Sequence, residues 1–380
     1  MKILLKGYYG FGNLGDDVLM LITYHLITRI YPSAEIFVFS NYTPNLADYD
    51  QKPRYNKYIF KILRTEVQLV DWTHKGHYDL IVYGGGGIYF DHEKGSVLRR
   101  ILNRIIKVLG SSKIYRVDGW LRRILNKPNR ITAAKKIAIG VGLAEYTPGS
   151  KLLYEHMADI GSISKFFVRD DISVTKLNEL KYNNDIVRLT DLAFLTSFWS
   201  SDIKIEKKSK SIGIVLLDWD QHDQERFMGI AQVSNQLTDS GFKITFYSFD
   251  ENHDKSLIQY FSNKPLKVWR PNQSSLNDYL EHFSTNEILI TSRAHGAILG
   301  AVLGVIPICI NISIKLEQVS LMFPTSGKLI EDFAAADQFI QVINEIHSNL
   351  NTYQMRLKSD VATSQEKIQH LESSLKSEFY

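Results

Sequence analysis

The stretch EILITSRAHGAILGAVLG, Glu287 to Gly304, decides the fold class of this chain. Its first part, EILIT, is a short apolar run typical of a buried parallel strand, and GAILGAVLG has the composition of the helix that follows. The residues Ser292 to His295 therefore lie at a strand-to-helix turn. In an open α/β sheet, ligands bind at the carboxyl ends of the strands, where helix N-termini favour anions. Arg293 and His295 at such a turn predict a site for an anionic substrate.

A structural explanation of the same residues is also open. Ser292 can cap the helix, Arg293 can pair with a structural carboxylate, and His295 can be a satisfied polar residue in the first turn. The surrounding sequence has to decide between the two explanations.

Strand-like apolar runs alternate with helical patterns along the chain, as in βαβ units around parallel sheets. These runs are Lys2 to Lys6, Glu35 to Ser40, Asp79 to Tyr83, Lys136 to Gly142, Lys165 to Arg169 and Asp185 to Leu189, then Ser211 to Asp218, Phe242 to Phe249, Leu266 to Arg270, Glu287 to Ser292 and Ile306 to Asn311. The lysine-rich stretch 200–211 interrupts the alternation and predicts an interdomain linker. We therefore expect an α/β protein with two Rossmann-like domains (1–199 and 212–331), a cleft between them, and C-terminal helices over 332–380.

Composition favours an ordinary globular protein. The chain has 380 residues, of which 44% are hydrophobic, enough for the cores of two domains. A single cysteine, Cys309, excludes an intrachain disulfide and favours a reducing compartment. No apolar run is long enough for a secretion signal or a membrane span, so we expect a cytoplasmic protein.

Positive charge is concentrated in residues 97–136. This basic segment holds twelve Lys or Arg residues and one acid, Asp118, although the whole chain has a net charge of only +4. Apolar residues recur there at helical spacing, which predicts a basic amphipathic helix. Such a helix either contacts an anionic membrane or packs on the core with a solvated basic face. No zinc-finger or RNA-binding signature accompanies the charge, so we expect no nucleic-acid partner.

Two glycine clusters follow predicted strands. GYYGFGNLGDD, Gly7 to Asp17, allows a tight turn and a close backbone approach to a ligand. GGGG, Gly84 to Gly87, follows DLIVY, and four glycines cost so much backbone entropy that a bare turn explains them poorly. We expect open backbone at both strand ends. The candidate ligand contacts from these clusters are Gly10, Gly12, Asn13, Asp16, Asp17, Gly85, Gly86 and the nearby Asp91.

Two further strand ends carry charge. Arg169 ends KFFVR and either clamps an anion or pairs with the adjacent Asp170 or Asp171, and Asp191 follows DIVRLT. A doubly wound topology would turn all these strand ends toward one cleft.

The chain resembles the polysaccharide pyruvyltransferase family in an ordered set of motifs. They are GYYGFGNLGDD, GGGG with Asp91, VRD at 168–170, TDLAF at 190–194, and SRAHG at 292–296 with Lys315 downstream. The resemblance spans about Gly7 to Lys315, and the N-terminal motif is its most specific part. The chain departs from the family pattern at Ala294, where leucine is usual, and at Leu192, where proline is common.

The resemblance implies a fold like that of two-domain GT-B glycosyltransferases. It implies transfer of pyruvate from phosphoenolpyruvate to two hydroxyls of a saccharide, as a cyclic ketal, in exopolysaccharide or cell-surface glycan biosynthesis. It further implies that Arg169, Arg293 and Lys315 bind the donor's anionic groups. Phosphoenolpyruvate is then a co-substrate, no cofactor is expected, and no cluster has metal-ligand spacing.

The chemistry gives the remaining residues roles. Ketal formation requires protonation of the enol methylene, and we expect His295 to be the general acid. Asp16 or Asp17 would act as base or sugar anchor. The acceptor would be a saccharide or a lipid-linked oligosaccharide, met at the inner face of the plasma membrane through the basic segment.

Two other functions stay open. One is a GT-B glycosyltransferase that uses a nucleotide-sugar donor, with Arg293 on the diphosphate. The other is a non-catalytic saccharide-binding protein that keeps the fold.

Overall fold

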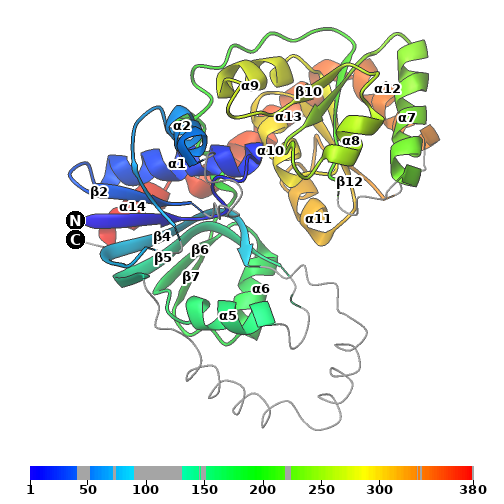
Figure 1. Ribbon diagram of the computed structural model, residues 1–380. Helices are drawn as coiled ribbons and strands as arrows, with labels where there is room; N and C mark the ends of the chain where they lie inside the picture. The colour runs from blue at the N-terminus through cyan, green and yellow to red at the C-terminus, as the bar shows by residue number, and fades with distance from the viewer. Residues whose placement is uncertain are drawn as a thin grey trace, which may run out of the picture.

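The computed structural model describes residues 1–40, 52–71, 74–89, 131–144, 146, 151–218, 224–331, 333 and 336–378 (Figure 1). Within them the chain forms two parallel sheets, each flanked by helices. The predicted fold class, α/β with two Rossmann-like halves in a GT-B-like arrangement, is confirmed. Asp91 and all of the basic segment before Ile131 lie outside the described residues.

The N-terminal half is built on a seven-stranded sheet of order β3-β2-β1-β4-β5-β6-β7. Its strands are β1 (Lys2–Lys6), β2 (Glu35–Phe39), β3 (Gln68–Val70), β4 (Gly76–Tyr89), β5 (Ile131–Leu143), β6 (Lys165–Val168) and β7 (Asp185–Arg188). Its helices are α1 (Leu14–Ile30), α2 (Lys52–Leu63), α5 (Lys151–Ile160), α6 (Asp171–Glu179) and the 3₁₀ turns η2 (Leu192–Phe194) and η3 (Thr196–Phe198). The chain reverses its strand order between β1 and β4, which is the switch point where such sheets bind ligands.

The C-terminal half repeats this plan with a six-stranded sheet of order β10-β9-β8-β11-β12-β13. Its strands are β8 (Ser211–Val215), β9 (Lys243–Ser248), β10 (Leu266–Val268), β11 (Ile288–Thr291), β12 (Ile306–Ile310) and β13 (Lys328–Ile330). Its helices are α7 (Gln224–Asp239), α8 (Lys255–Tyr260), α9 (Leu276–Ser284), α10 (Ala294–Val302) and α11 (Ile314–Ser320). Here the switch point lies between β8 and β11, and β11 leads directly into the turn that carries Arg293 and His295.

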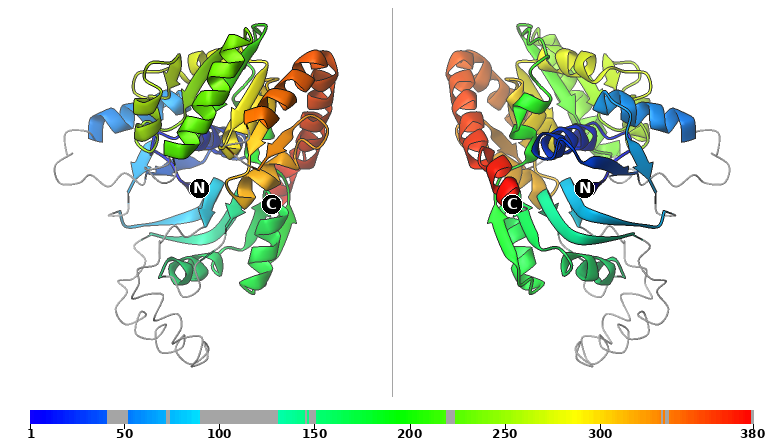
Figure 2. Two further views of the ribbon diagram at one scale, coloured as in Figure 1. Left: turned by 90° about the vertical axis from the view of Figure 1, so that its right-hand side faces the viewer. Right: turned by 90° about the vertical axis from the view of Figure 1, so that its left-hand side faces the viewer.

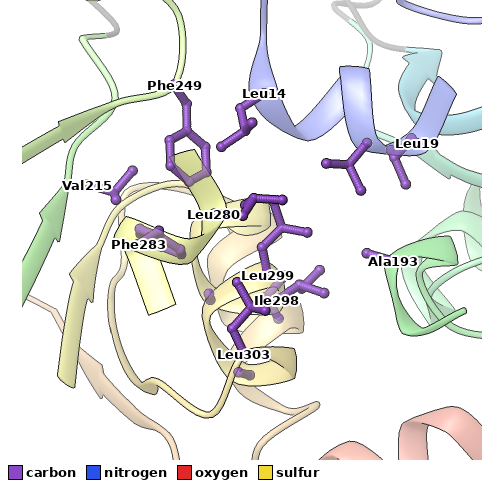
Figure 3. Packing of buried hydrophobic residues seen from close by; sticks show 14 of the residues in the cluster. Leu14, Leu19, Ala193, Val215, Phe249, Leu280, Phe283, Ile298, Leu299 and Leu303 are labelled. Carbon is purple, nitrogen blue, oxygen red and sulfur yellow. The ribbon is translucent and has the colours of Figure 1, made fainter. Parts of the chain in front are cut away.

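The two halves share one hydrophobic core. A single cluster of buried residues runs from α1 through η2 to the C-terminal sheet and α10. Figure 3 shows Leu14 of α1 beside Phe249, with the side chains of α9 and α10 below them. A second cluster fills the other face of the N-terminal sheet, under α5 and α6. Helix α1 is therefore one of the elements that join the halves, and its N-terminus lies against α10 of the C-terminal half.

The predicted linker, residues 200–211, runs between η3 and β8. Its Lys207 donates hydrogen bonds to the carbonyl oxygens of Ser284, Asn286 and Leu303 at 2.8 to 3.0 Å, which anchors the linker to the C-terminal half. The domain limits and the cleft between the domains stay predictions.

The chain ends in helices α12 (Ala336–Ser348), α13 (Leu350–Ile368) and α14 (Leu371–Ser377), which run from the C-terminal half back to the N-terminal half (Figure 2). Leu371 and Leu375 of α14 are buried, and Tyr31 at the end of α1 donates a hydrogen bond to the carbonyl oxygen of Leu375. The other residues of α14 are exposed or half-exposed, so this polar end of the chain forms a surface helix with one buried face. No helix in the described ranges combines the length and apolar composition needed to cross a bilayer.

One sequence prediction needs correction at β4. The four glycines do not follow the strand but continue it, because β4 extends to Tyr89 and pairs with β5 along its length. A Cβ atom at Gly84 would lie 2.5 Å from the Tyr9 hydroxyl and from a methyl carbon of Thr23, so glycine is needed for the close approach of α1. Lys135 and Lys136, the end of the basic segment, belong to β5 and form ion pairs with Glu378 and Asp159.

Candidate functional site

The β1–α1 junction separates the two candidate aspartates. Asn13 caps α1, and its side-chain oxygen accepts hydrogen bonds from the backbone N–H groups of Gly15 and Asp16. Successive helical residues point about 100° apart. Asp16 and Asp17 consequently face different surroundings.

Asp17 is fully buried between the two halves. It accepts hydrogen bonds from Trp269 Nε1 (2.8 Å) and from the hydroxyl of Tyr58. Burial raises the pKa of the Asp17 carboxyl well above its usual range. Since a different carboxylate oxygen accepts each bond, Asp17 holds α1 against its neighbours, and its predicted role as base does not fit this geometry.

Asp16 points to the other side, toward the glycine run of β4. A Cβ atom at Gly86 would lie 2.9 Å from Asp16 Oδ1. Burial raises the pKa of the Asp16 carboxyl to about 6, although the charges of His295, Lys315 and Arg169 oppose this rise. Three predicted site residues from three different segments therefore lie near enough to act electrostatically on one carboxylate.

Arg169 follows β6 and is 4% exposed. Its Nε donates to Asp170 and its Nη1 donates to Asp191, both at 3.2 Å. Burial alone would lower the pKa of the Arg169 guanidinium, but Asp191 and Asp170 outweigh it and raise that pKa. A Cβ atom at Gly142 of β5 would lie 2.6 Å from Nε, so the guanidinium needs a glycine on the neighbouring strand.

His295 lies in the first turn of α10, against the first turn of α1. Its Nε2 is 3.5 Å from Asp191 Oδ2, an ion-pair distance, and finds no aligned hydrogen-bond partner among the described residues. A Cβ atom at Gly15 would lie 2.2 Å from the other ring nitrogen, Nδ1. Gly15 thus gives the imidazole its place between the two halves.

Asp191 lies between Arg169 and His295. It is fully buried, and its other oxygen, Oδ1, caps η2 by accepting the backbone N–H of Ala193. Burial would raise its pKa, but the interactions with His295 and Arg169 dominate and lower the pKa of Asp191 to about 2. One carboxylate of the N-terminal half therefore lies against both Arg169 and His295.

Lys315 completes the group from the first turn of α11. Burial and the neighbouring Arg169 lower its pKa to about 8, against the opposing charges of Asp16 and Asp170. We name the set Asp16, Arg169, Asp191, His295 and Lys315 the charged cluster.

Arg293 is directed away from the charged cluster. Its Nε donates to the carbonyl oxygen of Leu216 (3.1 Å), and its Nη2 donates to Asp254. The structural explanation of the turn thus holds for Arg293, which pairs with a buried carboxylate. Ser292 does not cap α10, since its hydroxyl accepts the backbone N–H of Leu217 instead.

The remaining candidates are backbone positions. Gly10, Gly12, Gly85 and Gly86 all have positive φ, between 56° and 85°. Gly12 faces Pro271 of the other half, and Gly85 and Gly86 lie inside β4 against Leu19 of α1. No group of three or more His, Cys, Asp or Glu side chains in the described ranges is arranged to hold a metal ion.

The comparison with sequence models of protein families shows to which family the chain belongs. The sequence model of the family described as "Polysaccharide pyruvyl transferase" matches residues 13–313. The chain belongs to the polysaccharide pyruvyl transferase family. No curated protein matches it.

Solved structures of other proteins share the fold of this pyruvyl transferase family member. The UDP-GlcNAc 2-epimerase from Neisseria meningitidis is similar with a TM-score of 0.56 at 10% identity, over 99% of this chain and 100% of the epimerase. The UDP-GlcNAc 2-epimerase from Methanocaldococcus jannaschii has a TM-score of 0.52 at 13% identity, over 91% of this chain and 93% of the epimerase. At these identities the likeness shows the fold alone.

Of the predicted site residues in this family member, Asp16, Arg169, His295 and Lys315 lie in the charged cluster. Asp17 and Arg293 bind other partners, Trp269 and Asp254 respectively. Asp191 was noticed at a strand end but not selected as a site residue. Its position after β7, in the same series as Arg169 after β6, was the available signal.

Proposed function

We propose that the protein transfers pyruvate from phosphoenolpyruvate to two hydroxyls of a saccharide, forming a cyclic ketal. The observation that carries the proposal is the charged cluster. Arg169 and Lys315 are two cations from different halves, and His295 shares the carboxylate of Asp191 with Arg169. Family membership supports the reaction class.

The donor suits this arrangement because it carries a carboxylate and a phosphate. A guanidinium and an ammonium held at strand ends can neutralise and orient both groups. Asp170 and Asp191 fix the Arg169 guanidinium, so little side-chain entropy is lost when the donor binds.

We assign the general acid to His295 and the base to Asp16. Protonated His295 gives its proton to the methylene carbon of phosphoenolpyruvate, which creates an oxocarbenium-like carbon. A sugar hydroxyl attacks that carbon and loses its proton to Asp16. The carbon–oxygen bond to phosphate then breaks, and phosphate leaves with the proton from Asp16. The second hydroxyl closes the ring, and its proton returns to His295.

The surroundings of the two groups match these roles. Asp191 lies 3.5 Å from His295 Nε2 and can orient the imidazole, as the third member of a catalytic triad does. The pKa of about 6 makes Asp16 a carboxylate at neutral pH that can still accept a proton. Arg293 supports the β11–α10 turn through Asp254, so we assign it a positioning role in place of the predicted donor contact.

The test is calorimetric titration with phosphoenolpyruvate. Lys315→Met and Arg169→Lys should weaken binding by roughly ten- to a hundredfold, because each removes a charge-assisted contact. Lys328→Met is the matched control, since Lys328 pairs with Glu345 at the surface of β13 and should not affect binding. Wild-type protein that does not bind phosphoenolpyruvate, with or without sugar, would contradict the proposal.

A nucleotide-sugar transferase remains the alternative to exclude. The fold is shared with a UDP-GlcNAc 2-epimerase solved with UDP-GlcNAc bound, so UDP-GlcNAc belongs in the titration. Tight binding of UDP-GlcNAc without phosphoenolpyruvate binding would favour this alternative.

The acceptor and the place of reaction are also part of the proposal. We propose a saccharide acceptor that is lipid-linked, with the basic segment holding the enzyme at the inner face of the plasma membrane. Sedimentation with anionic and neutral vesicles tests this. Equal, weak binding to both vesicle types would remove the membrane contact from the proposal.

A further inference from the structure

The loop between β1 and α1 presents two aromatic rings that no core explains. Tyr8 and Phe11 stack with ring centroids 4.1 Å apart and an interplanar angle of 18°. Both residues are only half-buried, and neither belongs to the two hydrophobic clusters of the described residues. By contrast Tyr9, between them, is 1% exposed and donates its hydroxyl to the carbonyl oxygen of Gly84 (2.7 Å).

The backbone of this loop is shaped to hold the stacked pair in place. Gly10 and Gly12 flank Phe11 with φ of 85° and 78°, a conformation that other residues rarely adopt. The chain therefore turns sharply on both sides of Phe11 and returns its ring to Tyr8. The end of the loop is fixed by a hydrogen bond from Leu14 N to the carbonyl oxygen of Phe249 in the C-terminal half (2.9 Å).

A free carboxylate accompanies the rings. Asp16 begins the helix that follows the loop, and no hydrogen bond to its carboxylate occurs within the described residues. Burial, with Asp16 and Asp250 nearby, raises the pKa of the Tyr8 hydroxyl to about 12, which agrees with a position beside Asp16. Asp250 already accepts hydrogen bonds from the backbone N–H groups of Asn252 and His253 and from His253 Nδ1, and its side chain is 1% exposed. Of these two carboxylates, Asp16 is therefore the one better placed to accept a ligand hydroxyl.

We infer that the stacked rings of Tyr8 and Phe11, beside the carboxylate of Asp16, form the subsite on which the acceptor pyranose ring lies. This inference rests on the proposed function and names the place of its second substrate. A pyranose has an apolar C–H face, which the negative face of an aromatic ring attracts, and a polar edge, which a carboxylate can bind. Phosphoenolpyruvate has no such face, and the negative faces of the two rings would repel its negative charges. The acceptor hydroxyls would then meet the donor next to the proposed base.

Saturation-transfer NMR with methyl hexopyranosides tests the subsite. Saturation of the protein's aromatic protons, with phosphoenolpyruvate present, should reach the C–H protons of one face of the bound sugar. Tyr8→Leu and Phe11→Leu keep apolar volume but remove the ring. Each should reduce the transferred signal at least fivefold and raise the acceptor KM by about tenfold, while the Kd for phosphoenolpyruvate changes less than twofold.

Tyr260→Ala is the control, because Tyr260 is a 39% exposed ring on α8 outside the loop. It should behave as wild type. Unchanged saturation and KM in both leucine variants would overturn the subsite, as would wild-type protein with no transfer to any sugar. Wild-type protein that does not bind phosphoenolpyruvate would instead contradict the proposed function. Saturation transfer to the sugar is a separate measurement, so the two failures can be told apart.

Discussion

Asp191→Asn separates the charge of Asp191 from its shape. The change keeps the side chain's size and removes the negative charge that lies 3.2 Å from Arg169 Nη1 and 3.5 Å from His295 Nε2. A pKa of about 2 in place of 3.8 means that the fold favours the charged carboxyl by about 2 kcal/mol. We expect the variant to lose stability of that order and kcat to fall roughly ten- to a hundredfold.

The pH dependence of Tm and of the rate tests whether the lost charge of Asp191 causes these effects. Because the pKa of Asp191 is depressed, its stabilisation is present above about pH 4 and is lost as the pH falls toward 2. The difference in Tm between wild type and variant should therefore shrink below pH 4. Protonated His295 loses its anionic neighbour in the variant, so the basic limb of the pH–rate profile should move to lower pH.

The assay is steady-state release of phosphate from phosphoenolpyruvate across pH 5 to 9, with thermal unfolding measured in parallel. Asp171→Asn is the matched control, because Asp171 pairs with Arg188 at the surface with its side chain 76% exposed, and should change stability by less than about 0.5 kcal/mol. Wild-type kcat with an unmoved basic limb in Asp191→Asn would refute the assignment of Asp191 as the partner of His295.

Three further predictions follow from the described contacts. Asp16→Asn should abolish turnover yet raise Tm at pH 8, because the raised pKa of about 6 makes the charged carboxyl unfavourable by about 1 to 3 kcal/mol; a Tm gain that persists at pH 4 would contradict this cause. Gly15→Ala should lower kcat at least tenfold and also lower Tm, since its φ tolerates alanine but the new Cβ atom would lie 2.2 to 2.7 Å from Nδ1, Cγ and Cβ of His295, so that the start of α10 must shift; unchanged kcat would show that the imidazole can move freely. Asp360→Ala should destabilise the protein by about 2 to 4 kcal/mol without changing the KM for phosphoenolpyruvate, because it leaves four hydrogen-bond donors on Thr325 and Ser326 without their acceptor. The loss of stability should be smaller in Asp360→Asn, which keeps one side-chain oxygen.

Much of the fold follows from local patterns in the sequence. Apolar runs at the period of buried strands located eleven of the strands, and their alternation with helices predicted two parallel sheets. The edge strands β3 and β13, of three residues each, were missed, whereas the equally short edge strand β10 was located because Trp269 extends its apolar run. The glycines of β4 were expected to form open backbone after the strand, but they continue the strand, where the close approach of α1 requires glycine.

The charged cluster was predictable only in part. Arg169, His295 and Lys315 stand at strand ends, and topology brings strand ends together. The difference between Asp16 and Asp17 depends on which side of α1 meets Trp269, a residue 252 positions away. The pairing of Asp191 with His295 likewise joins two halves whose packing no local pattern encodes.

The return of α14 to the N-terminal half bears on how the chain is made. Glu378 binds Lys165 of β6 at 2.6 Å, and Leu371 and Leu375 cover apolar surface near α1. At about 5 to 20 residues per second, the ribosome releases these residues roughly 10 to 40 s after the sheet that they cover. The nascent N-terminal half therefore waits with an uncovered apolar surface and is a natural client for chaperones. A chimera between relatives should exchange residues 1–199 together with 371–378, because either piece alone would carry an unmatched surface.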